Sequence, residues 1–117
     1  YAGQSYFAID SLGPTKGFAA WADDSGTVRA LGSRFRLGES ARILVRLPRK
    51  PEVAFETVIL RDGASIMTSN STETEFRVHQ PGVYRIVVRL FTSLSVLDGG
   101  RWLPWIMTNP IVITPRS

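Results

Sequence analysis

The fold of this chain is decided by the segment Pro81-Gly82-Val83-Tyr84-Arg85-Ile86-Val87-Val88-Arg89-Leu90. Pro-Gly is typical of a turn, and the residues after it alternate in character. Tyr84, Ile86, Val88 and Leu90 fall on one side, whereas Arg85 and Arg89 fall on the other. A period of two is typical of a strand with one buried face. The segment therefore predicts a turn that leads into an antiparallel strand with its apolar side on a core.

A second segment follows, Trp102-Leu103-Pro104-Trp105-Ile106-Met107-Thr108-Asn109-Pro110-Ile111-Val112-Ile113. Its first part predicts an aromatic loop, and Ile111 to Thr114 predicts a closing strand. Together the two segments predict the edge-sealing end of a β-sandwich. Neither carries a reactive side chain, which favours a supporting or binding module over a catalyst.

The rest of the chain repeats period-two alternation in short runs separated by Gly, Pro, Asp and Ser. Asp62-Gly63 is the strongest hairpin signal. No helical period is sustained, so we predict an all-β, immunoglobulin-like antiparallel β-sandwich of about eight strands, one domain over residues 1–117. The runs that carry this prediction are Ser5 to Asp10, Gly17 to Asp23, Thr27 to Leu31, Phe35 to Leu37, Ala41 to Leu47, Glu56 to Arg61, Ser65 to Thr68, Thr72 to His79, Gly82 to Leu90, Leu94 to Leu97 and Ile111 to Thr114.

Tyr84 follows Pro81-Gly82 at the start of a predicted strand. In immunoglobulin-like sandwiches a tyrosine at this corner donates its hydroxyl hydrogen back to the backbone. Ile86 stands where antibody domains have the second cysteine of their disulfide, and this chain has no cysteine. We therefore expect a tyrosine corner without the disulfide.

The residues that could carry chemistry are sparse. His79 is the only imidazole and stands at the mouth of a turn, with no Gly-x-Ser-x-Gly nucleophile elbow in the chain. Glu73 and Glu75 are about 7 Å apart along a strand, within the range of inverting glycosidases. Arg77 lies beside them on the same polar face, which favours a solvated ladder of charges. We expect no catalytic residue, no metal site and no cofactor.

The charge is +4, carried mainly by twelve Arg against two Lys. Such a surface could attract phosphates or acidic partners. The preferred interpretation is that these arginines are solvent-facing strand residues whose stems cover apolar surface, so nucleic-acid binding is disfavoured. Apolar runs such as Trp102 to Met107 are too short to span a bilayer, so we expect no membrane span. Because Tyr1 stands in place of an initiating Met, we expect the chain to be a fragment of a larger protein.

Trp102 and Trp105, with Arg101 and Asn109, form a candidate interface. We favour docking of the tryptophan pair against another domain, then core packing, then stacking on sugar rings, since Trp is enriched at interfaces. Trp21 alternates opposite Phe18 and Ala20 and is assigned to the second face of its strand.

Several segments are similar to the small β-sandwich that follows the catalytic barrel in bacterial PHP-domain proteins (the polymerase and histidinol phosphatase superfamily). The similar segments are Ser5-Tyr6-Phe7-Ala8-Ile9-Asp10-Ser11-Leu12-Gly13, Gly17-Phe18, Arg61-Asp62-Gly63, Pro81-Gly82-Val83-Tyr84-Arg85 and Trp105-Ile106-Met107-Thr108-Asn109-Pro110-Ile111. The resemblance covers nearly the whole chain and its motifs are moderately specific.

The resemblance implies a parent enzyme that is a metal-dependent phosphoesterase or related hydrolase. Its His and Asp metal ligands would lie in the barrel, and no position of this chain matches them. The resemblance thus implies a non-catalytic accessory C-terminal domain that packs on the catalytic domain of the same polypeptide. The alternative is a carbohydrate- or anionic-surface-binding module that uses Trp102, Trp105 and the arginines.

Overall fold

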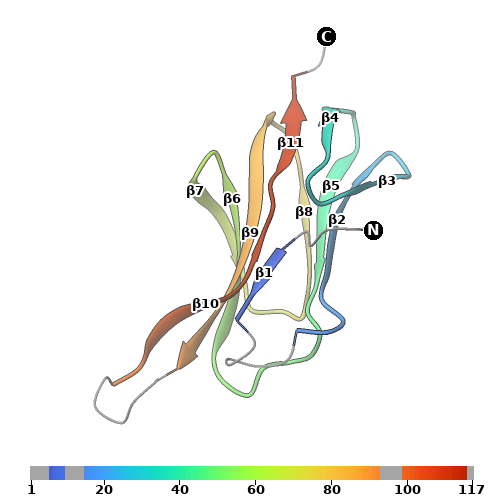
Figure 1. Cartoon of the computed structure of the whole chain (residues 1–117). Helices are drawn as coiled ribbons and strands as arrows, with labels where there is room; N and C mark the ends of the chain where they lie inside the picture. The colour runs from blue at the N-terminus through green and yellow to red at the C-terminus, as the bar shows by residue number, and fades with distance from the viewer. Residues whose placement is uncertain (1–5, 10–14, 93–98, 116–117) are drawn as a thin grey trace.

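The computed structural model describes residues 6–9, 15–92 and 99–115, and over these ranges it is all-β (Figure 1). Two sheets face each other in a sandwich-like arrangement, as the sequence predicted. The expected count of about eight strands is not confirmed, because the described residues form eleven strands, and β10 forms where a loop was expected. The strands are β1 (Tyr6–Ala8), β2 (Ala19–Asp24), β3 (Thr27–Ala30), β4 (Arg34–Arg36), β5 (Ala41–Arg46), β6 (Phe55–Arg61), β7 (Ala64–Ser69), β8 (Glu73–Arg77), β9 (Gly82–Thr92), β10 (Arg101–Thr108) and β11 (Ile111–Thr114).

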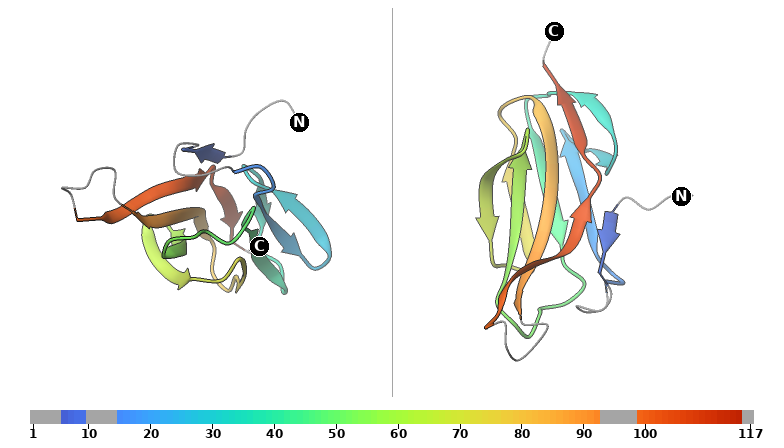
Figure 2. Two further views of the ribbon diagram at one scale, coloured as in Figure 1. Left: turned by 90° about the horizontal axis from the view of Figure 1, so that it is seen from below. Right: turned by 60° about the vertical axis from the view of Figure 1, so that its left-hand side comes forward.

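The larger sheet, which we call sheet A, is built around β9 (Figures 1 and 2). One side of β9 pairs with β6, which pairs in turn with β7. The other side pairs first with β11 and then with β10. β1 continues the sheet beside β10, and β4 lies parallel to β11. The smaller sheet, sheet B, has the order β3-β2-β5-β8 with antiparallel neighbours.

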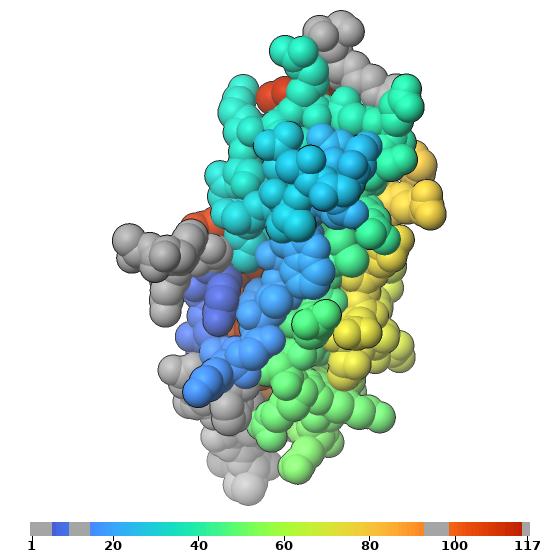
Figure 3. Space-filling view, turned by 90° about the vertical axis from the view of Figure 1, so that its right-hand side faces the viewer, coloured from blue at the N-terminus to red at the C-terminus, as the bar shows by residue number. Residues whose placement is uncertain are grey.

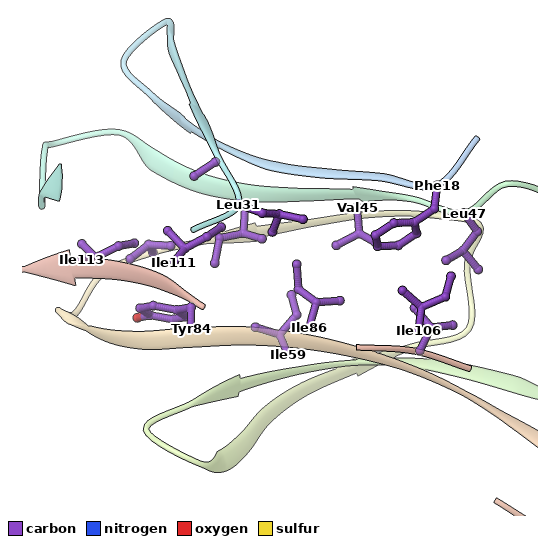
Figure 4. Packing of buried hydrophobic residues seen from close by; sticks show 14 of the residues in the cluster. Phe18, Leu31, Val45, Leu47, Ile59, Tyr84, Ile86, Ile106, Ile111 and Ile113 are labelled. Atoms are coloured by element: carbon purple, nitrogen blue, oxygen red, sulfur yellow. The ribbon is translucent and has the colours of Figure 1, made fainter. Parts of the chain in front are cut away.

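The core lies between the two sheets (Figure 4). The side chains that the alternation placed inward are buried there, including Ile43 and Val45 from β5 and Ile86 and Val88 from β9. A strand whose successive side chains alternate in burial has one solvent-exposed face and one buried face. This pattern is typical of antiparallel sheets in a sandwich. Both sheets therefore present an outer face to the surroundings.

The Asp62-Gly63 turn joins β6 to β7, as predicted, with φ of 52° and 86°. Both residues are in the left-handed region that a two-residue type I′ hairpin requires. The turn is also tied to β9, since the Val83 amide donates to Asp62 Oδ1 (2.9 Å) and the Asp62 amide donates to the Val83 carbonyl (2.8 Å).

The tyrosine corner is confirmed. The Tyr84 ring is in the core and its hydroxyl donates to the Gln80 carbonyl oxygen at 2.6 Å. This contact spans the turn before β9 and fixes where the strand begins.

The predicted aromatic loop is wrong, because Arg101–Thr108 is a strand, β10, that pairs with β9. The pairing shifts register between Pro104 and Ile106, which marks a β-bulge. Proline is tolerated at bulges and at edges, and the β1 pairing reaches only as far as Ile106. The extra residue lets two consecutive side chains, Trp105 and Ile106, both point into the core.

The expected strand Leu94 to Leu97 lies outside the described residues, as do both ends of the run Ser5 to Asp10 and the Ser11-Leu12-Gly13 part of the resemblance. None of the described segments is a helix long and apolar enough to cross a lipid bilayer.

Candidate functional site

The outer face of sheet A carries a continuous line of apolar side chains, which we call the apolar row. Val58, Val87, Met107 and Phe7 are successive cross-strand partners on β6, β9, β10 and β1. Their exposure rises along the row, from 7% at Val58 to 38% at Met107 and 68% at Phe7. An antiparallel sheet that faces water has polar residues on its outer side. The apolar row departs from that pattern across four strands.

The row leads to a projecting ribbon formed by the end of β9 and the start of β10 (Figure 1, lower left; Figure 2). The β6 pairing begins at Leu90 and the β1 pairing stops at Ile106, so beyond these points Phe91 pairs with Trp102. One further hydrogen bond, from the Phe91 amide to the Ala54 carbonyl oxygen (2.9 Å), ties the base of the ribbon to the segment before β6. Their rings stack with centroids 5.5 Å apart and planes 24° apart. A two-stranded ribbon is marginal in water, and this aromatic contact stabilises it.

Arg89 joins the ribbon to the sheet. Its guanidinium carbon lies 5.0 Å from the centre of the Trp102 ring, and its Nε donates to Glu56 Oε1 at 2.9 Å. The cation therefore packs on the indole while a carboxylate from β6 holds it in place. We refer to Arg89, Phe91 and Trp102 together as the aromatic arm.

The structure separates the four residues of the predicted interface. Trp102 is 41% exposed, on the arm. Arg101 pairs with Thr92, so alternation places it on the opposite side of the ribbon. Trp105 is 2% exposed and belongs to the core. Asn109 is exposed between β10 and β11, about 20 Å along the strand from Trp102.

The tryptophan pair therefore does not act as a unit. Trp105 fits the core-packing alternative and not the docking prediction, because the bulge turns its side chain into the core. The exposed apolar surface is instead made by Phe7, Met107 and Phe91, which the sequence analysis did not single out. One signal was present, since the outward positions Val83, Val87 and Phe91 of β9 are apolar on a side expected to be polar.

The ionisable groups near His79 do not converge on one centre. His79 is exposed and borders a depression of about 260 Å³ that Asp23, Glu39 and Arg42 also line. The Asp23 carboxylate is already engaged, since Gly26 N–H donates to Oδ1 and Arg42 donates to Oδ2, both at 2.9 Å. Within residues 6–9, 15–92 and 99–115, no three acidic or His side chains are grouped to hold a metal ion.

Glu73 and Glu75 lie on the exposed side of β8, where the alternation placed them. Glu73 pairs with Arg46 (3.4 Å) and Glu75 with Arg42 (3.2 Å). The hydrogen bond to Asp23, and then the charge of Glu75, raises the pKa of Arg42 above its usual value. The two glutamates are thus members of a ladder of opposite charges.

Comparison with protein-family models, curated proteins and solved structures found no match to this chain.

Proposed function

We propose that this chain is a non-catalytic accessory domain that packs on the catalytic domain of the same polypeptide through the outer face of sheet A. The observation that carries the proposal is the apolar row, continued by the aromatic arm. Full burial of a Phe or Met side chain contributes about 1.5–3 kcal/mol, so such a row gains by being covered. Contiguous exposed apolar patches mark interaction sites.

The charges around the row indicate the chemistry of the partner. Arg85 pairs across the strands with Leu60, and Arg34 pairs with Val112, so exposed arginines flank the apolar centre. A complementary surface has an apolar centre with acidic groups at its rim. The resemblance to PHP-domain proteins supplies the identity of that surface, a bacterial metal-dependent phosphoesterase or related hydrolase domain that precedes this chain.

An immunoglobulin-like topology is part of the proposal. In that fold, strands B and E lie in one sheet and C, F and G in the other. In chain order, β5 and β8 lie in sheet B, whereas β6, β9, β10 and β11 lie in sheet A. The tyrosine corner at Tyr84 occurs at the start of the strand that corresponds to F. These features support the assignment.

The docking test uses the longer polypeptide that the proposal requires. Met107→Glu places a charge in the apolar row, and Val28→Glu is the matched control, an exposed apolar residue (69%) on β3 of the other sheet. We expect Met107→Glu to increase the rate of proteolysis between the two domains and Val28→Glu to leave it unchanged. Equal rates in both variants, or a gene without a preceding catalytic domain, would overturn the proposal.

The lack of activity has its own test. The 117-residue chain is assayed for phosphoesterase turnover with Mn²⁺ or Zn²⁺ added. We expect none above the metal alone, because the described residues offer no grouped metal ligands. Metal-dependent turnover by the purified chain would contradict a purely accessory role.

The alternative of a carbohydrate- or anionic-surface-binding module loses the pair on which it was based. Trp105 is in the core, and the Trp102 ring already contacts Phe91 and Arg89. The specific observation that favours ligand binding lies on the other sheet.

A further inference from the structure

The outer face of sheet B differs from that of sheet A in being built from paired charges around an apolar centre. Trp21 on β2 and Leu44 on β5 are cross-strand partners, and Leu44 pairs in turn with Glu75 on β8. Arg46 and Glu73 form the neighbouring pair. Figure 3 shows this side of the molecule, with β2 in blue and β8 in yellow.

These side chains line a depression of about 230 Å³, which we call the Trp21 trough. Leu44 lies on the strand between Trp21 and the two glutamates, so the trough has an apolar floor, an indole on one side and carboxylates on the other. β2 and β8 are two strand spacings apart, about 9–10 Å. The indole and the acids therefore stand on either side of Leu44.

Each carboxylate at the trough is engaged by an arginine. Arg46 Nε lies 3.4 Å from Glu73, and Arg42 bridges Glu75 and Asp23. Two guanidiniums face three carboxylates, which leaves a small negative excess, so the site does not favour an anionic ligand. Paired carboxylates still have lone pairs that accept hydrogen bonds, and a guanidinium has five N–H donors. The trough therefore offers an apolar surface together with acceptors and donors, and its small negative excess disfavours anions.

We propose that the Trp21 trough binds one neutral pyranose ring of a polysaccharide. The apolar C–H face of the sugar packs on the indole and on Leu44. Its hydroxyl groups donate to Glu73 and Glu75 and accept from Arg46. The Arg46 guanidinium lies 5.8 Å from the Trp21 ring centre and is 59% exposed, so it can shift aside at little cost.

This inference is independent of the docking proposal. The trough and the apolar row are on the outer faces of different sheets, with the core between them. A domain that docks through sheet A would hold the trough away from its partner, so each proposal can fail without the other.

Affinity gel electrophoresis in native gels containing xylan, mannan, a β-glucan or the anionic polysaccharide polygalacturonate tests the proposal. We expect retardation of the wild-type chain in at least one of the neutral gels. Loss of the indole should weaken that binding about tenfold, as expected for about 1.4 kcal/mol of lost contact. Trp21→Ala is therefore compared with Trp102→Ala, the control on the other sheet, which should match the wild type.

Glu73→Ala is a second variant in case Trp21→Ala does not fold, since Glu73 is 72% exposed and makes little contact with the core. It should also weaken retardation. Raising salt from about 0.05 M to about 0.5 M should leave the binding unchanged, because the interaction does not depend on net charge. Three results would overturn the proposal: no retardation in any neutral gel, retardation only in polygalacturonate and lost in salt, or neutral binding that folded Trp21→Ala and Glu73→Ala both retain.

Discussion

Tyr84 serves both the core and the corner at a single position. Its ring is nearly fully buried, and its hydroxyl donates to the Gln80 carbonyl oxygen. Burial raises the pKa of Tyr84 above its usual value of 10, because the phenolate is less well solvated there than in water, while the nearby charge of Arg61 opposes the shift. The neutral, hydrogen-bonding form is therefore the one that the fold holds.

Removing the hydroxyl and removing the ring should have different costs. Tyr84→Phe keeps the packing and loses one hydrogen bond, for which we expect about 1 kcal/mol of unfolding free energy. Tyr84→Ala also opens a cavity, and we expect about 3 kcal/mol. Urea unfolding followed by Trp fluorescence measures both. Equal losses in the two variants would show that the ring contributes nothing.

The same residue predicts a dependence on alkaline pH. In the unfolded chain the phenol ionises near pH 10, whereas the folded value is higher. The stability that Tyr84 contributes is therefore fully present below about pH 10 and is lost as the pH rises through the folded value. We expect the difference in unfolding free energy between the wild type and Tyr84→Phe to shrink above about pH 10. A difference that stays constant to about pH 11.5 would contradict this.

At the scale of single elements, β10 shows how a bulge prevents a strand from being recognised in the sequence. Trp105 and Ile106 are consecutive and both buried, which breaks the alternation that identifies strands. Pro104 strengthens the impression of a loop, since proline donates no hydrogen bond. By contrast, Ile43, Val45 and Leu47 alternate cleanly and their strand was found from the sequence.

The candidate site was harder to predict than the strands, for a related reason. The apolar row exists only because Val58, Val87, Met107 and Phe7 fall in register on four strands. Register between strands distant in sequence depends on the whole sheet, so no local pattern specifies it. The alternation within single strands therefore predicts which side chains are buried. It does not predict which side chains come together on the outer face of the sheet.

β10 also predicts losses of stability of very different size for two tryptophans three positions apart. Trp105→Ala should destabilise the chain by about 3–5 kcal/mol, because a large core side chain is lost. Trp102→Ala should cost less than about 1 kcal/mol in the same chain, because the Trp102 ring is part of an exposed arm. Thermal unfolding of both variants checks this. A larger loss for Trp102→Ala would mean that the arm supports the core.

At the scale of the whole molecule, the outer faces of the two sheets carry different kinds of side chain. The outer face of sheet A carries the apolar row and the projecting aromatic arm, whereas that of sheet B carries ion pairs around Trp21. Under the docking proposal, a partner that covers the outer face of sheet A would hold the domain in one orientation. The outer face of sheet B then remains available to a ligand.

The exposed side chains of the apolar row predict self-association of the isolated chain. We expect the isolated chain to form dimers or larger species at high concentration, and the Phe7→Glu, Met107→Glu double variant to be monomeric with an unchanged melting temperature. Sedimentation velocity over a concentration series measures this. If the wild type and the double variant sediment alike at every concentration, the apolar row does not mediate self-association.

The parallel pairing of β4 with β11 brings residues 34–36 beside residues 112–114. During synthesis, residues 34–36 leave the ribosomal tunnel long before residues 111–114. β4 therefore lacks its β11 partner until Ile111–Thr114 has emerged. Sheet A is consequently completed only after β11 is available, and until then the edge of β4 that pairs with it stays open.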